Sequence, residues 1–466
     1  MRTLFTAALL AVAPFTAGVA GQQLVTLPPG SWANDITPDG EVVVGTYSGG
    51  GFIWRWRTEP SPTVVPGGDM VAVSDDGTVV CGNMPDPVSG AEVAGRWTAS
   101  TGWEPLGSLL GDDGCGSLSH AYDISGDGST IVGLAWNGCS GRGFRWTEAT
   151  GMQELMNLVN GNNRASAISG DGSLIGGFAQ GDFDRTPAYW TPDTVGLTVD
   201  SSLVGEVHGI SHDGATSVGG VKFPGVGEQR AFIRDTATGQ TQNLGNLNGG
   251  FWKGIATDLS HDGQVVVGYD TIGLGREAWV WTPADGIVGL DTILADAGLG
   301  GGFPTWVCRA VSGDGTVVVG GGEGDGSVFG FGAFIAELPD LVDDPWTDLG
   351  GGTAGANGVP TLVGSGSLVG GTAVGLSLSG APRDALMVAW LAFDSQPFAA
   401  LGGTVHAAPF AQQFVFRADG GGNFAAGTTW PTGLPAGTEA WFQFVVEDPS
   451  VIWGLTLSNG LKATTP

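Results

Sequence analysis

The chain has 466 residues, of which 42% are hydrophobic and 14% charged, so it can bury more than one core. Its net charge of -29 repels other polyanions, which argues against nucleic acid or an anionic lipid surface as a partner. The 85 glycines have no Gly-X-Y period and alternate with Val, Ile, Phe and Trp. This composition argues against collagen and disorder and predicts an all-β protein with many tight turns.

Residues 1–20 have the pattern of a secretion signal peptide. Arg2 supplies a positive start, Leu4 to Thr16 form an apolar run, and Gly18-Val19-Ala20 offer small residues for cleavage. A membrane anchor is the alternative, but the run is shorter than the roughly 20 apolar residues that a membrane span needs. We therefore predict a secreted protein without a membrane span, extracellular or at the cell surface, with the periplasm as the alternative destination.

An Asp-Gly pair within one fixed motif recurs seven times, with a mean spacing of about 46 residues, which is in the range of solenoids and propellers. An aliphatic residue stands three positions before each Asp, Ser or Thr two positions before it, and glycine six positions after it. The seven aspartates are Asp39, Asp76, Asp127, Asp171, Asp213, Asp262 and Asp314.

Each repeat continues with a third apolar run, such as "GFRWT" or "AWVWT", and most have a fourth after a Thr-Gly or Asp-Gly turn. Four strands in about 46 residues is the size of one propeller blade. An open solenoid is the alternative, but a closed ring leaves no exposed sheet edge at its ends. We predict a seven-bladed β-propeller over residues 21–338.

The two ends of this repeat array complement each other. The seventh repeat lacks a fourth strand, because "GAFIAEL" runs directly into Pro339, whereas "QQLVTLP" at residues 22–28 is a fourth-strand pattern with no repeat before it. If residues 22–28 complete the last blade, they tie the ring closed. The alternative is that every blade starts with this kind of strand, which leaves seven intact blades and no tie.

The motifs "HAYDISGDGSTIVG" and "AISGDGSLIGGF", each followed by an aromatic run, resemble HAF repeats, an extracellular bacterial repeat family. The resemblance covers roughly residues 24–337. It implies secretion and an all-β array, and it implies no catalytic residues. Repeats five and seven depart from the pattern, with Arg234 and Ala336 at the usual Trp position.

The composition changes after Leu338, where the Asp-Gly register stops. Pro, Gly and Asp in residues 339–356 indicate a linker or a loosely packed entry segment. Alternating apolar runs then predict an antiparallel β-sandwich over residues 357–466. The stretch "PTLVGSGSLVGGTAVGLSLSGAP" and the "SNGL" ending resemble a C-terminal module of secreted planctomycete proteins, which supports export more than any function.

We interpret the repeated aspartates as turn residues. Asp-Gly supplies the positive φ angles of a two-residue hairpin turn, and a Ser two positions earlier can bond the backbone of the turn. A calcium loop would need three or more oxygen ligands at a spacing such as Asp-x-Asp-x-Asp-Gly, which these turns lack. We therefore predict no bound metal and no cofactor.

Aromatic residues are the candidates for ligand binding. The repeated tryptophans are expected to pack blade against blade, with a sugar-stacking ladder as the alternative; they are Trp56, Trp97, Trp146, Trp190 and Trp281. Other aromatics lie outside the repeat pattern, in the segments that lead into the first strand of a repeat, and rim packing is their alternative role. These candidate ligand-binding residues are Trp32, Phe251, Trp252, Phe303 and Trp306.

The sequence contains none of four common catalytic motifs: Gly-x-Ser-x-Gly, His-Glu-x-x-His, Cys-x-x-Cys and the phosphate loop. We therefore predict a secreted, non-catalytic and monomeric binding or scaffold protein, with an unknown glycan or protein ligand. The alternative is a carbohydrate-active hydrolase or lyase, since such enzymes need only two carboxylates at the right separation. The acids that the repeat does not explain are Asp112, Asp113, Asp182 and Asp184.

Four cysteines in an exported chain allow three full pairings. Cys115 precedes Asp127 by 12 residues and Cys139 follows it by 12, so the hairpin turn brings the two opposite each other. We predict a disulfide between Cys115 and Cys139. Cys81 and Cys308 belong to repeats two and seven, which repeat one separates in a ring, and we predict two buried free thiols.

Overall fold

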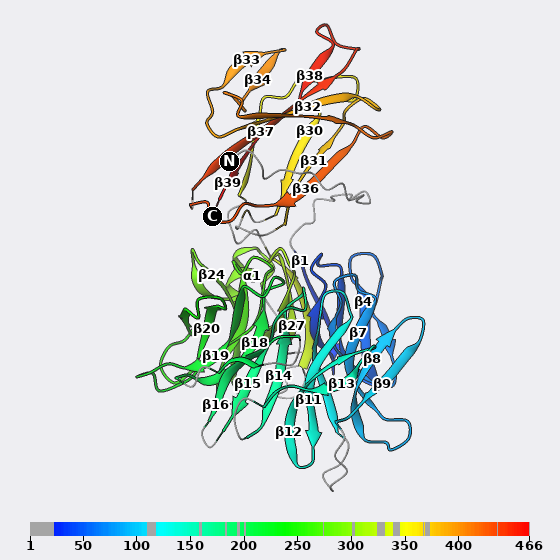
Figure 1. Cartoon of the computed structure of the whole chain (residues 1–466), viewed down its shortest axis with the longest axis vertical. Helices are drawn as coiled ribbons and strands as arrows, with labels where there is room; N and C mark the ends of the chain where they lie inside the picture. Colours follow the sequence, from blue (N-terminus) through cyan, green and yellow to red (C-terminus); the bar gives the residue numbers. More distant parts are fainter. Residues whose placement is uncertain are drawn as a thin grey trace. The chain divides into compact units, whose positions relative to one another are not determined.

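The computed structural model shows a chain built almost entirely of β-strands, in two compact units within residues 20–342 and 343–466 (Figure 1). No helix in the part that it describes is long and apolar enough to cross a membrane. The described residues are 23–109, 118–157, 161–181, 184–192, 196–199, 202–273, 275–300, 303–323, 331–338, 345–366, 368, 373–435 and 437–465.

The first unit is a β-propeller of seven four-stranded antiparallel sheets. Blade 1 contains β2 (Trp32–Ile36), β3 (Val42–Tyr47), β4 (Gly50–Arg55) and β5 (Thr63–Val65). Blade 2 contains β6 (Asp69–Val73), β7 (Val79–Pro85), β8 (Glu92–Thr98) and β9 (Gly102–Gly107). Blade 3 contains β10 (Ser119–Ile124), β11 (Thr130–Asn137), β12 (Ser140–Thr147) and β13 (Gly151–Glu154). Blade 4 contains β14 (Asn163–Ile168), β15 (Ile175–Gln180), β16 (Arg185–Trp190) and β17 (Gly196–Val199).

The remaining three blades follow the same order, except that the last takes one strand from the start of the chain. Blade 5 contains β18 (Val204–Ile210), β19 (Thr216–Lys222), β20 (Arg230–Asp235) and β21 (Thr241–Gly245). Blade 6 contains β22 (Lys253–Leu259), β23 (Val266–Ile272), β24 (Gly275–Thr282) and β25 (Gly286–Gly289), followed by the short helix α1 (Leu290–Asp296). Blade 7 contains β26 (Thr305–Val311), β27 (Val317–Glu323), β28 (Phe331–Glu337) and β1 (Gln23–Pro29).

The first strands of the blades form a closed ring around a central channel. They contact one another in chain order, and β26 of blade 7 contacts β2 of blade 1. Strand β1 pairs antiparallel with β28, from Gln23 opposite Glu337 to Thr26 opposite Phe334. The prediction that the N-terminal strand completes the last blade is therefore confirmed, and the alternative of seven intact blades is wrong.

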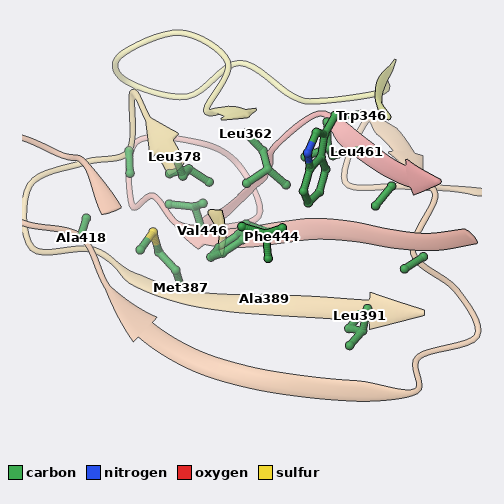
Figure 2. Close-up of a cluster of buried hydrophobic side chains, with 14 of the residues drawn as sticks. Trp346, Leu362, Leu378, Met387, Ala389, Leu391, Ala418, Phe444, Val446 and Leu461 are labelled. Atoms are coloured by element: carbon green, nitrogen blue, oxygen red, sulfur yellow. The ribbon is translucent and has the colours of Figure 1, made fainter. Parts of the chain in front are cut away.

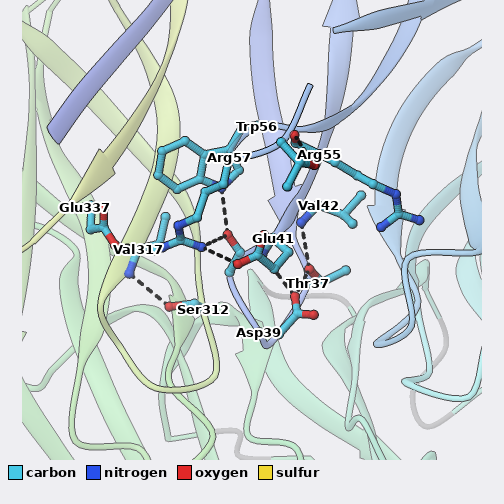
Figure 3. Close-up of polar contacts among 12 residues, drawn as sticks. Thr37, Asp39, Glu41, Val42, Arg55, Trp56, Arg57, Ser312, Val317 and Glu337 are labelled. Atoms are coloured by element: carbon cyan, nitrogen blue, oxygen red, sulfur yellow. Dashed lines mark hydrogen bonds and ion pairs between the residues drawn. The ribbon is translucent and has the colours of Figure 1, made fainter. Parts of the chain in front are cut away.

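Apolar residues between adjacent blades hold the ring together. Each repeated tryptophan belongs to a buried cluster that it shares with the preceding blade, as predicted. Trp281 of blade 6, for example, packs with Val218 and Ala231 of blade 5. Polar contacts join blades 1 and 7 as well, because Arg57 Nη2 lies 2.8 Å from the Glu337 carboxylate (Figure 3).

The second unit is a β-sandwich. A six-stranded sheet in the order β29-β39-β37-β32-β35, with β38 paired to β37, packs on the three-stranded sheet β30-β31-β36. Trp346, Leu378, Met387 and Phe444 from the two sheets meet in one core (Figure 2). The strands are β29 (Trp346–Gly350), β30 (Thr361–Ser365), β31 (Ala373–Ser379), β32 (Leu386–Ala392), β33 (Phe398–Ala400), β34 (Gly403–Val405), β35 (Gln412–Arg417), β36 (Phe424–Thr429), β37 (Glu439–Glu447), β38 (Leu455–Leu457) and β39 (Gly460–Thr464).

Two elements differ from the expectation. Strand β29 lies within residues 339–356, which we expected to be a linker or entry segment, and it belongs to the sandwich because Trp346 is buried in the core. Helix α1 stands where only strands and turns were expected. Its Leu290 and Leu294 are buried against blades 6 and 7, so packing stabilises this short helix.

Candidate ligand site at the open end of the channel

The Asp-Gly turns lie at one end of the propeller. In blade 1 the Thr37 hydroxyl donates to Asp39 Oδ1 at 2.6 Å and accepts the Val42 N–H at 3.0 Å (Figure 3). Hydroxyl–carboxylate bonds of 2.6–2.8 Å recur in the other six turns. Among the described residues, the turn aspartates do not have the positive φ that a two-residue turn requires, so that expectation is wrong. The turn is a longer loop, and of each Asp-Gly pair only the glycine has a positive φ, such as Gly40 at +69°. The hydrogen bonds of the Asp carboxylate and of the Ser or Thr hydroxyl stabilise the rest of this loop.

Hydrogen bonds join most neighbouring turns at this end of the channel. The Gly126 N–H donates to Gly170 O at 2.8 Å, and the Gly313 N–H donates to Pro38 O at 2.9 Å. Across the ring, Asp75 of the second turn lies 3.2 Å from His212 Nε2 of the fifth turn. The His212 ring in turn lies 4.6 Å from the ring of His261. The hydrogen bond to Asp75 raises the pKa of His212 above its ordinary value.

A β-bulge interrupts every first strand at the same register position, one residue after the first-strand residue that pairs with the repeated glycine. The seven bulged residues together line a cavity of about 400 Å³ in the channel. These residues differ in chemistry from blade to blade: they are Asn34, Val71, Tyr122, Ser166, His208, Thr257 and Arg309.

This bulge explains the glycine that stands six residues after each Asp. A Cβ on Gly45 would lie 1.9 Å from the carbonyl oxygen of Trp32, and one on Gly133 would lie 2.0 Å from that of His120. The other five glycines meet the corresponding first-strand carbonyl at 1.7–2.2 Å. Only glycine therefore fits on the second strand beside the bulged first strand. The repeated glycine therefore accommodates the bulge, and the bulged residue lines the channel.

Aspartates follow the bulge in blades 1, 3 and 6 and join first strands to each other. Asp123 accepts the N–H groups of Ile124 and, from the next blade, Ile168, both at 2.8 Å. Burial raises the pKa of Asp123 to about 7 and that of Asp258 to about 6. Burial, together with the charges of Asp123 and Asp258, raises the pKa of Asp35 well above its ordinary value. None of these three carboxyl groups lines the cavity of about 400 Å³.

A second cavity, of about 500 Å³, lies beside the first between blades 4, 5 and 6, and the two share Arg164 and His208. Its walls come from the beginnings of first strands and the ends of second strands, so it lies at the end of the propeller opposite the Asp-Gly turns. Among its lining residues are Arg164, Arg185, Lys222, Lys253, Asp184, Glu206 and Glu228.

Glu206 organises the charges in this second cavity. Its buried carboxylate is bonded to the Arg164 guanidinium and lies 3.2 Å from Arg185 Nη1 and 3.5 Å from His208 Nδ1. Burial acts to raise the pKa of Glu206, but the charges of His208 and Arg164 outweigh it and hold that pKa below its ordinary value. Both guanidinium groups also lie over the Phe178 ring, with that of Arg185 4.3 Å from its centroid. The two arginines are therefore fixed in place before any ligand arrives.

The candidate aromatics line neither cavity. Trp32 and Trp306 both contact Phe331, at ring distances of 5.0 and 5.4 Å, and Phe303 contacts Phe334 at 6.3 Å. These contacts correspond to the rim packing that was their alternative role.

The other two candidates lie before β22. Phe251 is 80% exposed, and the carbonyl of half-buried Trp252 accepts hydrogen bonds from Arg230 and Asn246. A ligand-binding role for these aromatics stays a prediction. The structure thus brings Trp32 and Trp306 together around the aromatic ring of Phe331, whereas Phe251 and Trp252 lie in a separate loop.

Of the acids that the repeat does not explain, Asp184 lines the larger cavity, whereas Asp112, Asp113 and Asp182 lie outside the described residues. Sequence reasoning missed Arg164, Lys222, Lys253 and Arg309. For the lysines the sequence did contain a signal, because two of the three in the chain lie in neighbouring repeats, Lys222 at the end of a second strand and Lys253 at the start of a first strand. No group of three metal-ligating side chains is found within the described ranges.

The cysteines agree with the prediction as far as the structure describes them. Cys81 and Cys308 are free and fully buried, which confirms that prediction. Burial raises the pKa of both thiols well above the ordinary value. Cys139 is disulfide-bonded, but Cys115 lies outside the described residues, so their pairing stays a prediction.

No protein-family model and no curated protein matches the chain. Among solved structures, the β-propeller domain of the Trilobed protease from Pyrococcus furiosus is 10% identical, with a TM-score of 0.43 over 70% of this chain and 100% of that one. Oligogalacturonate lyase from Vibrio parahaemolyticus is 12% identical, with a TM-score of 0.44 over 69% and 98%. A putative TolB from Agrobacterium tumefaciens is 15% identical, with a TM-score of 0.36 over 48% and 89%. At such low similarity they assign no activity to this chain.

Proposed function

We propose that this chain is a secreted, non-catalytic binding protein whose ligand occupies the open end of the propeller channel. The observation that carries the proposal is the set of bulged first-strand residues. The fold needs the bulge and the glycine beside it, but it does not need a particular side chain at the bulge. The seven side chains there all differ, which is the variation that recognition of an asymmetric ligand requires.

The two cavities support this location. Their volumes of about 400 and 500 Å³ are in the range of small-molecule sites, and they adjoin at Arg164 and His208. At the opposite end, hydrogen bonds join most neighbouring turns, and no turn residue lines either cavity. Secretion rests on residues 1–20 and on the resemblance to HAF repeats.

Binding without catalysis fits the charge state of Glu206. A general acid in a glycosidase needs a raised pKa, whereas the charges of His208 and Arg164 hold the pKa of Glu206 below its ordinary value, so Glu206 does not fit that role. For the rival function, a hydrolase or lyase, the remaining carboxylates that line this cavity are Asp184 and Glu228.

The test combines a glycan array and a small-molecule panel with a turnover screen on the purified full chain. Val204→Trp adds bulk to a lining residue that is 38% exposed without changing its charge, and Val64→Trp does the same on β5 away from both cavities. We expect ligands that bind the unaltered chain and Val64→Trp, lose binding to Val204→Trp, and are not converted. Binding that Val204→Trp leaves unchanged contradicts the site, and release of reducing ends or unsaturated products contradicts the non-catalytic function.

A further inference from the structure

We infer that the ligand of this site is a small organic anion, bound through a carboxylate or phosphate group by Lys222, Lys253 and Arg185. A second anionic group, where the ligand has one, would reach Arg309 in the adjoining cavity. This inference rests on the proposed function, since it names the chemistry of the ligand for the same site.

The first support is where the lysines lie. The chain has three lysines, and two of them line the larger cavity. Neither Lys222 nor Lys253 makes a side-chain hydrogen bond or ion pair with any other residue in the part of the chain that the structure describes. The third, Lys462, is paired with Glu439 at 2.8 Å. Two unpaired ammonium groups on one wall are therefore available to an anion from solution.

The second support is the local charge. Four positive side chains line the larger cavity against three carboxylates, so its wall has a formal charge of +1 in a chain with a net charge of -29. Glu206 is already engaged by Arg164 and Arg185. Those two guanidinium groups still have N–H donors beyond the ones that Glu206 accepts, because each guanidinium carries five.

Arg309 extends the positive surface into the channel. It lies at the bulge of β26 and lines the cavity of about 400 Å³, with its guanidinium carbon 5.6 Å from the Trp32 ring centroid. Among the described residues, no carboxylate is paired with Arg309, whose titratable neighbours include Tyr269 and Arg276. The ring positions the guanidinium without neutralising its charge.

The size of the anion follows from the contrast between local and total charge. Attraction by the cavity wall extends over roughly one Debye length, about 8–10 Å at physiological salt. A long polyanion would place most of its charges against the acidic surface beyond that distance and would be repelled. An anion with one to three charges that fits within about 500 Å³ avoids this repulsion.

The experiment measures binding by calorimetry and thermal shift for matched probes: glucose, glucuronate and glucose 6-phosphate, with citrate as a compact polycarboxylate. The proteins are the full chain, the double variant Lys222→Gln/Lys253→Gln, the single variant Arg309→Gln and the control Lys462→Gln, which removes a lysine charge in the other unit. Each titration is run at about 50 mM and about 500 mM salt, because a charge-driven contact weakens as screening rises.

We expect at least one acidic probe to bind with 1:1 stoichiometry, at least tenfold more tightly than glucose, and tenfold or more weakly to the double variant than to Lys462→Gln. A preference for glucuronate over glucose 6-phosphate, or the reverse, identifies the anionic group. The inference is overturned if no acidic probe binds at low salt, if glucose binds as tightly as the acids, or if the double variant binds them unchanged.

The two proposals can fail separately. A neutral ligand that Val204→Trp excludes would contradict the anionic ligand and leave the channel site standing. Acidic probes that need Lys222 and Lys253 but that still bind Val204→Trp would support the anionic ligand and contradict only the part of the proposed site that Val204 lines.

Discussion

The two ends of the propeller channel are built from the same seven repeats but follow opposite rules. At the turn end, the same Ser or Thr, Asp and Gly recur in each blade and bond to one another within the turn, and backbone hydrogen bonds join most neighbouring turns. At the open end, the corresponding residues change from blade to blade and include unpaired cations. Repetition therefore marks the residues that hold the fold, and departure from repetition marks the residues free to bind a ligand.

The comparison separates two measurable quantities. Substitutions at the turn end should change the free energy of unfolding, and substitutions at the open end should change the affinity for a ligand. Substitutions at each end test whether stability and affinity change independently, and deletion of β1, which closes the ring, should change both.

Deleting residues 22–28 should lower the thermal midpoint by about 5–10 °C, because it unpairs the edge of β28 and removes the apolar contacts of Leu24, Val25 and Leu27. Ligand binding should weaken as well, because the closed ring of blades positions the residues at both ends of the channel. Differential scanning calorimetry measures the midpoint, with Thr26→Ser as a control that keeps the strand. An unchanged midpoint would mean that β1 does not hold the ring together.

Replacing Gly172 by Val should lower the free energy of unfolding by about 1–3 kcal/mol, because its φ of +72° strains a β-branched residue. Space is not the cause, since the nearest atom to an added Cβ is 3.8 Å away. Gly172→Asn should cost less, because Asn tolerates this conformation. Urea titration measures both variants, and equal losses would refute the backbone explanation. Added calcium should leave the unaltered chain unchanged; a rise of ten degrees would mean that the turn aspartates are ligands.

The raised pKa values of Asp123 and Asp258 predict a pH dependence. The folded chain holds these protons more tightly than the unfolded chain, so their contribution to stability is fully present below about pH 4. It is lost as the pH rises through about 6 and then about 7. Relative to the unaltered chain, Asp123→Asn should therefore gain roughly 2–3 kcal/mol between pH 5 and pH 8. Urea titrations at both pH values measure this difference, and a constant difference would show that Asp123 titrates normally.

The smallest effect on stability is expected from the double variant Lys222→Gln/Lys253→Gln. Because neither side chain has a partner among the described residues, the free energy of unfolding should stay within about 0.5 kcal/mol of its original value. Affinity for an anion, by contrast, should fall. Thermal shift without ligand tests this, and a large loss of stability would show that the lysines hold the fold instead.

The sequence predicted most of the fold because the fold is repeated. A seven-fold Asp-Gly register indicated the blades, and the unmatched run at residues 22–28 indicated the closing strand. The exceptions are local: β29 and α1 depend on the burial of Trp346, Leu290 and Leu294, which no repeat indicates.

The candidate site was harder to predict, because side-chain type was a poor guide to position. Trp32 and Trp306 were chosen as aromatics outside the pattern, and they pack around Phe331. The glycine six residues after each Asp was visible, but its cause, a bulge on the neighbouring strand, appears only in three dimensions. Once the bulge is known, the register alone places Arg309 and His208 at the channel.

The pairing of β1 with β28 also bears on how the propeller folds. It joins residues about 300 positions apart in the chain, so loop closure over nearly the whole unit must precede the last contact. Until residues near 337 have left the ribosome, β1 has no partner and the first-formed blades cannot form a ring. Such intermediates expose strand edges, which favours slow folding and aggregation at high concentration. Refolding in the presence of a synthetic peptide of residues 22–28 would show whether ring closure limits the rate.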